Sequence, residues 1–328
     1  MEFRQTLLSL PRLSNDNAEL VPRTDFDGPE LRFDFPGLEV GVAEYEEGPT
    51  GCTVFSLQEG AAASIDVRGG SPGVTGAGYD LVHAICFAGG SAYGLEATAG
   101  VAAELFARRE YRTGWLEIPL VAGAIVFDWG RRDNAIYPDK ELGRTAVRAA
   151  RPGVFPLGAR GAGRSATAGK LFAYEQGEPA GQGAAFRRIG ETRVAVFVVV
   201  NAIGAIIDRD GNVVRGHYDA KSGLRRKLVP GVEERLAGGQ PVRPPPGNTT
   251  LTVVATNLRL DSRQLRTLGR QVHASMARSI QPFHALEDGD VLFAVTTGAV
   301  ESDPLLDTTS LGVVASELAW DAVLSVAS

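Results

Sequence analysis

Apolar residues along this chain fall into two patterns, short continuous runs and residues spaced as on one face of a helix. Continuous runs rich in Val, Ile and Ala predict strands that are buried on both faces. Such runs lie at 40–43, 53–57, 81–87, 118–127, 194–201, 203–208, 251–256 and 291–297. The turn signal Asp210-Gly211 predicts that 203–208 forms a hairpin with Val213-Val214.

Helical spacing predicts three helices. They lie at about 94–109, after a cap at Asp261 or Ser262, and at the C-terminus. Their inward-facing residues are Leu95, Val101, Leu105 and Phe106; Leu265, Leu268, Val272 and Met276; and Leu311, Val314, Leu318 and Val323. Strands outnumber regular strand–helix alternations, and we find no repeat or linker. We therefore expect one α+β domain over residues 1–328, with sheets packed between helices.

Three segments lack a clear period. Residues 1–35 are mixed and polar, which is typical of an arm on the surface. Four glycines interrupt 158–169, which predicts a loop. Residues 216–248 are charged and rich in turn residues, and such long loops are more often functional than idle.

Composition narrows the function. The 328 residues are 44% hydrophobic and 22% charged, as in ordinary globular proteins. A net charge of -6 disfavours binding to nucleic acid or an anionic membrane. No apolar run reaches the ~18 residues of a transmembrane helix, and the N-terminus lacks a signal-peptide pattern. Two cysteines and four scattered histidines form no disulfide framework or zinc motif. We expect a cytoplasmic protein without a metal or organic cofactor.

Several catalytic motifs fail on inspection. Gly163 to Lys170 resembles a phosphate-binding loop, but five residues separate its glycines where the motif has four, and Leu171 replaces the magnesium-binding hydroxyl. Residues 89–94 precede a helix and could bind an anion there, although a packing turn is the simpler interpretation. Gly-x-Ser-x-Gly occurs once, at 69–73, without the helix pattern that must follow the serine of a nucleophile elbow.

Thr249 lies at the start of a predicted strand. It follows Gly247-Asn248 and, before them, a stiff run of three prolines at 244–246. It could simply begin that strand, or belong to the glycosylation sequon 248–250, which matters only in secreted chains. Alternatively, it is a nucleophile. A threonine hydroxyl needs an adjacent base, and an N-terminal threonine carries one in its own α-amino group. That amine appears if the hydroxyl attacks the Asn248 carbonyl and water hydrolyses the resulting ester.

Ordered blocks from about Leu31 to the C-terminus resemble the self-processing DmpA-like L-aminopeptidase/D-esterase family. The stronger resemblance is to its nylon-oligomer branch, the 6-aminohexanoate-oligomer endohydrolases. The blocks are RFDFPG at 32–37, YEEGPTG at 45–51, YPDK at 137–140, GQGAAFRR at 181–188, GNTT at 247–250, QPFH at 281–284 and WDAVL at 320–324. The resemblance implies an αββα sandwich, cut into 1–248 and 249–328, that stays assembled, usually as a homotetramer.

The resemblance also assigns roles: Thr249 as nucleophile, with Lys170, Asn201, Asp288 and Asp290 around it. These residue types suit the chemistry. An amide can donate to an oxyanion, a lysine can lower the pKa of an amine or hold developing negative charge, and carboxylates can orient the threonine amine and hydroxyl. Each residue also has a simpler interpretation: Asn201 could cap the end of its strand, and Lys170 could be a surface lysine. Asp288 and Asp290 could belong to a solvated Asp-Gly turn.

One departure from the family concerns Phe127, because relatives often have a tyrosine there. If that phenol helps to hold the substrate or the oxyanion, the second oxyanion donor of this chain is unassigned. The expected function is endo-hydrolysis of 6-aminohexanoate oligomers through an acyl-enzyme. The alternatives are an aminopeptidase or esterase acting on small peptides and amino-acid amides, an acetyltransferase, and a non-catalytic protein that binds through its glycine-rich loops.

Overall fold

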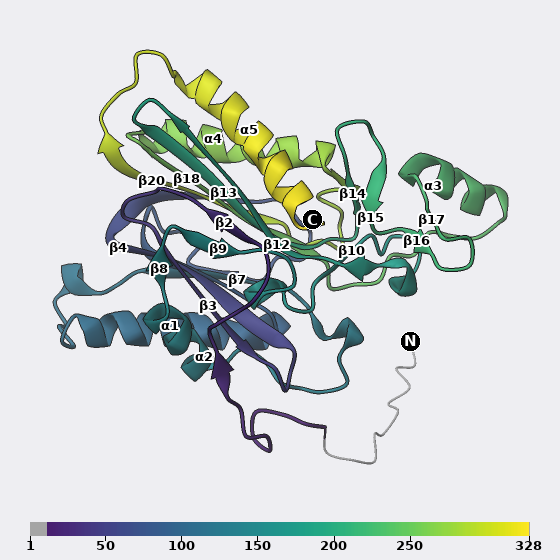
Figure 1. Ribbon diagram of the computed structural model, residues 1–328, viewed down its shortest axis with the longest axis horizontal. Coiled ribbons are helices and arrows are strands. Elements are labelled where there is room, and N and C mark those ends of the chain that lie inside the picture. The colour runs from purple at the N-terminus through teal and green to yellow at the C-terminus, as the bar shows by residue number, and fades with distance from the viewer. Residues whose placement is uncertain (1–11, 328) are drawn as a thin grey trace.

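Two facing β-layers, each covered by a pair of helices, make up the computed structural model, which describes residues 12–327 (Figure 1). Eleven of the described strands belong to one continuous hydrogen-bonded sheet, which forms both layers. The expected αββα arrangement is confirmed. Of the predicted N-terminal arm, residues 1–11 lie outside the described residues.

The first layer contains the strand that begins at Thr249. Its strands, in hydrogen-bonded order, are β12 (Gly181–Ile189), β13 (Thr192–Asn201), β18 (Thr249–Leu258) and β20 (Val291–Val300). All pairs are antiparallel except β18 with β20, which is parallel. The outer face is covered by α4 (Ser262–Ser275) and α5 (Thr308–Ser325). Asp261, one of the two predicted caps, caps α4 and accepts the Gln264 backbone N–H in a capping box.

The second layer contains β3 (Glu39–Tyr45), β4 (Thr50–Val67), β6 (Leu81–Ala88) and β7 (Val121–Ile125), with the short strands β1 (Pro22–Arg23), β5 (Val74–Thr75) and β8 (Arg151–Pro152). Two helices cover it, α1 (Leu95–Arg108) and α2 (Lys140–Arg148). They approach closely at Gly100, where a Cβ would stand 2.1 Å from the Lys140 carbonyl oxygen.

Strand β4 joins the two layers, and it is longer than the predicted 53–57. Its first half pairs with β3 and β6, and its second half pairs with β20. The register shifts between Ser56 and Ala61, around Gly60 at φ +81°. The sequence pattern missed the second half because this bulge interrupts it and small alanines follow.

Three hydrophobic clusters fill the spaces between the four layers. Along β18, Leu251, Val253 and Ala255 face the cluster between the two sheets, whereas Val254 and Leu258 face α4 and α5. Both faces of the strand are therefore buried, which explains why the sequence shows continuous apolar runs instead of alternation. Thr249 begins one of the most deeply buried strands.

Segment 216–248 is not the unstructured loop that the sequence predicts, because it contains a helix, α3 (Leu228–Ala237). Its signal is weak because Val229 and Leu236 face solvent, and only a small cluster around Phe172 receives the other side. The 203–208 hairpin is confirmed. The remaining short strands are β2 (Glu30–Arg32), β9 (Val154–Pro156), β10 (Thr167–Ala168), β11 (Glu178–Pro179), β14 (Ala205–Ile207), β15 (Val213–Arg215), β16 (Tyr218–Asp219), β17 (Leu224–Arg225) and β19 (Ile280–Gln281).

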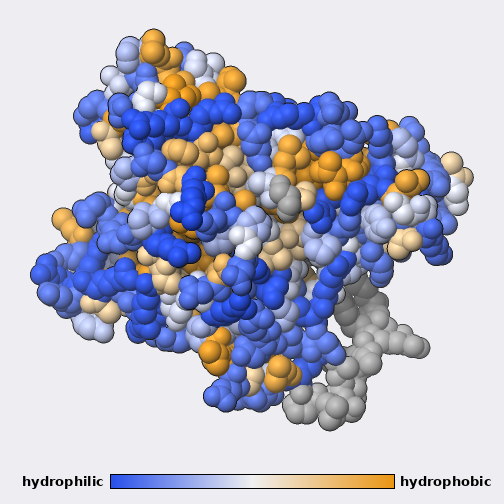
Figure 2. Space-filling view, viewed as in Figure 1, coloured by the Kyte–Doolittle hydropathy of each residue, from blue (hydrophilic) through white to orange (hydrophobic). Residues whose placement is uncertain are grey.

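Hydrophilic residues cover most of the face shown in Figure 2, with smaller apolar areas between them. None of the helices in residues 12–327 combines the length and apolarity that crossing a membrane requires.

Candidate active site

Thr249 is the first residue of β18 and directly follows Asn248. Only 4% of Thr249 and 2% of Asn248 is exposed to solvent. The Thr249 hydroxyl donates a hydrogen bond to the carbonyl oxygen of Asn248. The candidate nucleophile therefore lies beside the carbonyl group that it is expected to attack.

The same carbonyl oxygen accepts the backbone N–H of Gly289 at 2.8 Å. This contact arises because Asn248 forms a parallel bridge with Asp288, in the turn just before β20. A Cβ on Gly289 would stand 2.7 Å from Thr249 Oγ1 and 2.7 Å from the Ser71 carbonyl oxygen, so only glycine fits. Sequence reasoning missed this donor, and its one signal was the glycine between two aspartates.

Asn201 ends β13, directly opposite Thr249 in the sheet. Its side-chain amide donates to the carbonyl oxygens of Phe127 at 2.9 Å and Gly247 at 3.1 Å. Its Oδ1 accepts from the Thr167 backbone N–H at 3.1 Å. Both amide protons thus have partners in the uncut chain. The expected donation from Asn201 to an oxyanion requires Gly247 to move away.

Lys170 is buried next to Asn201, so the interpretation as a surface lysine is wrong. Its Nζ donates to the backbone oxygen and to Oδ1 of Asn201, both at 3.1 Å. Burial lowers the pKa of Lys170 to about 7, against an opposing contribution from the charge of Asp288. A substantial fraction of this amine is therefore neutral near neutral pH.

Asp288 and Asp290 are also buried, so the interpretation as a solvated turn is wrong. Asp290 Oδ1 accepts the Thr250 N–H at 2.7 Å, and Asp288 Oδ1 accepts the Ile203 N–H at 3.3 Å. Burial, with the negative charge of Asp290 next in weight, raises the pKa of Asp288 to about 8. Asp288 therefore keeps its proton at neutral pH.

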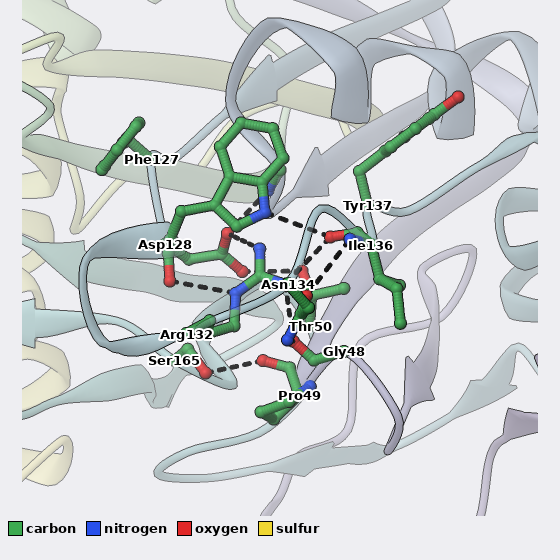
Figure 3. A network of polar contacts seen from close by, with 12 residues as sticks. Gly48, Pro49, Thr50, Phe127, Asp128, Arg132, Asn134, Ile136, Tyr137 and Ser165 are labelled. Carbon is green, nitrogen blue, oxygen red and sulfur yellow. Dashed lines mark hydrogen bonds and ion pairs between the residues drawn. The ribbon is translucent and has the colours of Figure 1, made fainter. Parts of the chain in front are cut away.

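Phe127 packs its ring against Gly247, where an added Cβ would stand 2.8 Å from the ring. Figure 3 shows the network of polar contacts around Asp128 and Arg132, with the Phe127 side chain pointing away from it. Asp128 accepts hydrogen bonds from Arg132 Nη2 and the Thr50 hydroxyl, both at 2.6 Å, and from the Gly90 N–H at 2.9 Å. This buried ion pair fixes the Phe127 carbonyl that orients Asn201.

The rejected motifs have structural explanations. The glycine turn before α1 directs its Gly90 N–H to Asp128, so a carboxylate of the chain itself occupies the place of an external anion. Lys170, in the phosphate-loop lookalike, points into the site just described. Across residues 12–327, no group of three or more His, Cys, Asp and Glu side chains is arranged to hold a metal ion.

Solved structures define the class of fold. A Burkholderia sp. beta-aminopeptidase aligns over 91% of this chain and 88% of its own, with a TM-score of 0.61 at 19% identity. The L-aminopeptidase D-Ala-esterase/amidase of Ochrobactrum anthropi aligns over 92% and 88%, with a TM-score of 0.63 at 15% identity. That second structure is described as a variant of the N-terminal-nucleophile (Ntn) hydrolase fold. The chain has this fold.

The family follows from sequence. The model of peptidase family S58 matches residues 33–327, and the chain belongs to this family. It is 49% identical to the 6-aminohexanoate-oligomer endohydrolase of Paenarthrobacter ureafaciens, over 94% of this chain and 89% of that protein. It is 32% identical to an uncharacterized aminopeptidase of Mycobacterium leprae (strain TN), over 78% and 73%. The chain is therefore a hydrolase of amide bonds.

Proposed function

We propose that this hydrolase cuts itself between Asn248 and Thr249 and then uses Thr249 as an N-terminal nucleophile. The observation that carries the proposal is the position of the Asn248 carbonyl, between the Thr249 hydroxyl and the Gly289 N–H. An attacking hydroxyl on one side and a fixed donor on the carbonyl oxygen are what acyl transfer requires.

In the proposed self-cleavage, the Thr249 hydroxyl gives up its proton, Oγ1 bonds to the Asn248 carbonyl carbon, and the oxyanion forms against the Gly289 N–H. The C–N bond then breaks, the nitrogen takes up a proton and becomes the α-amine of Thr249, and an ester remains. Water hydrolyses this ester and leaves a carboxylate on Asn248. Lys170 and Asp288 have pKa values near 7 and 8, which suits proton exchange at neutral pH.

The sheet pairing supports assembly of the two pieces, 1–248 and 249–328, as one domain. β18 of the second piece is hydrogen-bonded to β13 of the first along eight residue pairs, from Asn201 with Thr249 to Val194 with Thr256. β20 pairs with β4 of the first piece in the same way. Separating the pieces would expose both faces of β18 to water.

Substrate access requires that the new C-terminus at Asn248 leave the site. In the uncut chain, residues 247–248 occupy the position of an acyl group: Asn201 holds the Gly247 carbonyl and Gly289 holds the Asn248 carbonyl. Once they leave, the amide of Asn201 becomes available to a substrate oxyanion. The Thr249 amine then acts as the base that passes the hydroxyl proton to the leaving amine, and water hydrolyses the acyl-enzyme and releases the acid.

We further propose 6-aminohexanoate oligomers, cut internally, as the substrate class. The support is the 49% identity to endohydrolases of such oligomers over nearly the whole chain. Methylene chains offer about 0.8 kcal/mol for each buried CH₂ and no side chain to recognise. The alternative, an aminopeptidase or esterase acting on small peptides or amino-acid amides, is favoured by the fold neighbours and by the mycobacterial relatives.

Mass spectrometry of the purified protein tests self-cleavage. The 34.7 kDa chain should give pieces of roughly 26 and 8 kDa. Thr249→Ala should remain one chain, and Thr249→Ser, which keeps a hydroxyl, should still be cut. Cleavage at this bond in Thr249→Ala would refute the proposal. Size-exclusion chromatography with light scattering tests the homotetramer that we expect from the family resemblance.

Early products from an oligomer blocked at its N-terminus test the substrate proposal. Internal fragments are expected, because an endo-acting site does not need a free ammonium group. Trimming of the free oligomer, with the blocked one left intact, would favour the aminopeptidase.

A further inference from the structure

His284 makes two contacts with one carboxylate oxygen of the site. Its backbone N–H donates to Asp290 Oδ2 at 3.0 Å, and its ring Nδ1 lies 3.2 Å from the same oxygen. The residue has φ +60°, in the left-handed region that few residues other than glycine adopt. This conformation turns both groups toward Asp290.

Asp290 connects His284 to the residue next to the nucleophile. Its second oxygen, Oδ1, accepts the Thr250 N–H at 2.7 Å, and its side chain is fully buried. Two backbone donors therefore already favour the charged form of this carboxylate. A third donor on the ring would favour it further and would fix its orientation.

The surroundings of the ring indicate which tautomer is present. The Nε2 of His284 is buried and has no hydrogen-bond partner among residues 12–327. An imidazolium would bury a second N–H donor without a partner, which costs more than an unpaired acceptor nitrogen on a neutral ring. The neutral ring with its proton on Nδ1 satisfies Asp290 and leaves only that acceptor unpaired.

Other charged groups face this pair from several elements. Asp288 lies in the same turn, and Lys170 faces Asp288 from the segment after β10. On the far side, His273 of α4 packs edge-on to the His284 ring, with centroids 4.4 Å apart. Burial lowers the pKa of His273, and its Nδ1 contacts Asp66 of β4 at 2.9 Å.

Asp66 in turn pairs with Arg68 at 2.6 Å. The positive charge of the partly exposed Arg68 therefore compensates the negative charge of Asp66 outside the site. The Phe283 ring, with its centroid 4.0 Å from that of His284, closes the remaining side.

We propose that His284 is a positioning residue whose Nδ1–H holds the Asp290 carboxylate in the orientation in which it accepts the Thr250 N–H. This role rests on the proposed function of the site. The sequence resemblance includes the block that ends at His284 but gives that histidine no role. Loss of this hydrogen-bond donor should disfavour the charged form of Asp290, so that Asp290 ionises at a higher pH in the variant than in the parent.

Two substitutions separate the side chain from the backbone. His284→Gly suits φ +60° but removes the donor, whereas His284→Asn tolerates the same φ and places an amide N–H near the position of Nδ1. Tyr111→Gly is the matched control, because Tyr111 has φ +56° but is exposed on the surface. The readout is the pH–rate profile of the processed enzymes on a 6-aminohexanoate oligomer.

We expect the acid limb of His284→Gly to move up by about one pH unit, which is a tenfold change in proton affinity. In His284→Asn the acid limb should return to its pH in the parent enzyme, and in Tyr111→Gly it should not move. An equal loss of rate at every pH in His284→Gly would indicate a structural role only and would overturn the proposal, as would an unchanged profile.

A second measurement does not depend on activity. In the uncut Thr249→Ala chain, ¹³C NMR of labelled aspartate carboxyls follows the ionisation of Asp290 directly. Its midpoint should rise with His284→Gly and return with His284→Asn. If that pattern appears although the parent neither cuts itself nor hydrolyses the oligomer, the proposed function fails and the role of His284 stands. If neither substitution changes the midpoint, the role of His284 is refuted and the proposed function is not affected.

Discussion

Gly289→Ala isolates the contact between the turn before β20 and the nucleophile. The φ of Gly289 lies outside the left-handed region, so alanine brings no backbone strain. The substitution instead changes the space available around the Thr249 hydroxyl. The new Cβ would stand 2.7 Å from Thr249 Oγ1 and 2.7 Å from the Ser71 carbonyl oxygen, whereas ordinary contacts begin at 3.4 Å. The hydroxyl or the turn must therefore move by about 0.7 Å.

The expected loss follows from that displacement. A misplacement of about 1 Å at a reacting group can cost about 10²-fold in rate. Retreat of the turn instead would pull the Gly289 N–H from the Asn248 oxygen, and losing one such donor costs about 10²–10³-fold. Self-cleavage should therefore slow by about 10²-fold or more by either route. Overpacking should also destabilise the chain by about 1–3 kcal/mol.

Cell-free synthesis followed by intact mass measurement over time gives the rate of cleavage from the start. Gly78→Ala is the matched control, because a Cβ at that position would meet no atom within 4 Å and the φ of Gly78 is also unstrained. It should be cut at the parent rate. Cleavage of Gly289→Ala at the parent rate would refute both the close contact and the role of the Gly289 N–H.

Two further predictions concern Asn201 and Asp288. Processed Asn201→Ala should lose about 10²–10³-fold in turnover, the usual effect of removing an oxyanion donor, and normal turnover would exclude Asn201 from that role. Folded Asp288 keeps its proton up to about pH 8, whereas an unfolded aspartate loses it at about 3.9, so the folded chain binds more protons between these values and loses stability as the pH rises through them. In the uncut Thr249→Ala chain, Asp288→Asn should therefore reduce the fall in urea midpoint between about pH 5 and pH 8, and an equal fall in both chains would contradict the raised pKa.

The sequence predicted those parts of the fold that have a strong local signal. β13 and β18 are apolar on both faces, and α4 has a clear helical period after a capping residue at Asp261. The sequence missed α3, because Val229 and Leu236 face solvent and leave no apolar stripe. It also missed the second half of β4, where a bulge interrupts the pattern.

The candidate site divides in the same way. Thr249 could be found because a proline-rich segment and an apolar strand meet there, and the family resemblance supplied the polar residues. The Gly289 N–H has no side chain to recognise, and its contact depends on the bridge between Asn248 and Asp288, forty residues apart in sequence. The link from His284 to Asp290 depends on a left-handed backbone that the sequence does not reveal.

Strand topology explains why these groups meet. β18 and β20 are parallel, so their first residues lie at the same end of the sheet, and β13 is antiparallel to β18, so its last residue lies there too. Asn201, Thr249 and the turn 288–290 therefore lie together at one end of these strands. A shift of one residue in the pairing of β18 would turn the Thr249 side chain to the opposite face of the sheet. The apolar residues on both faces of β18 oppose such a shift, so the core that holds the two layers together also sets the position of the nucleophile.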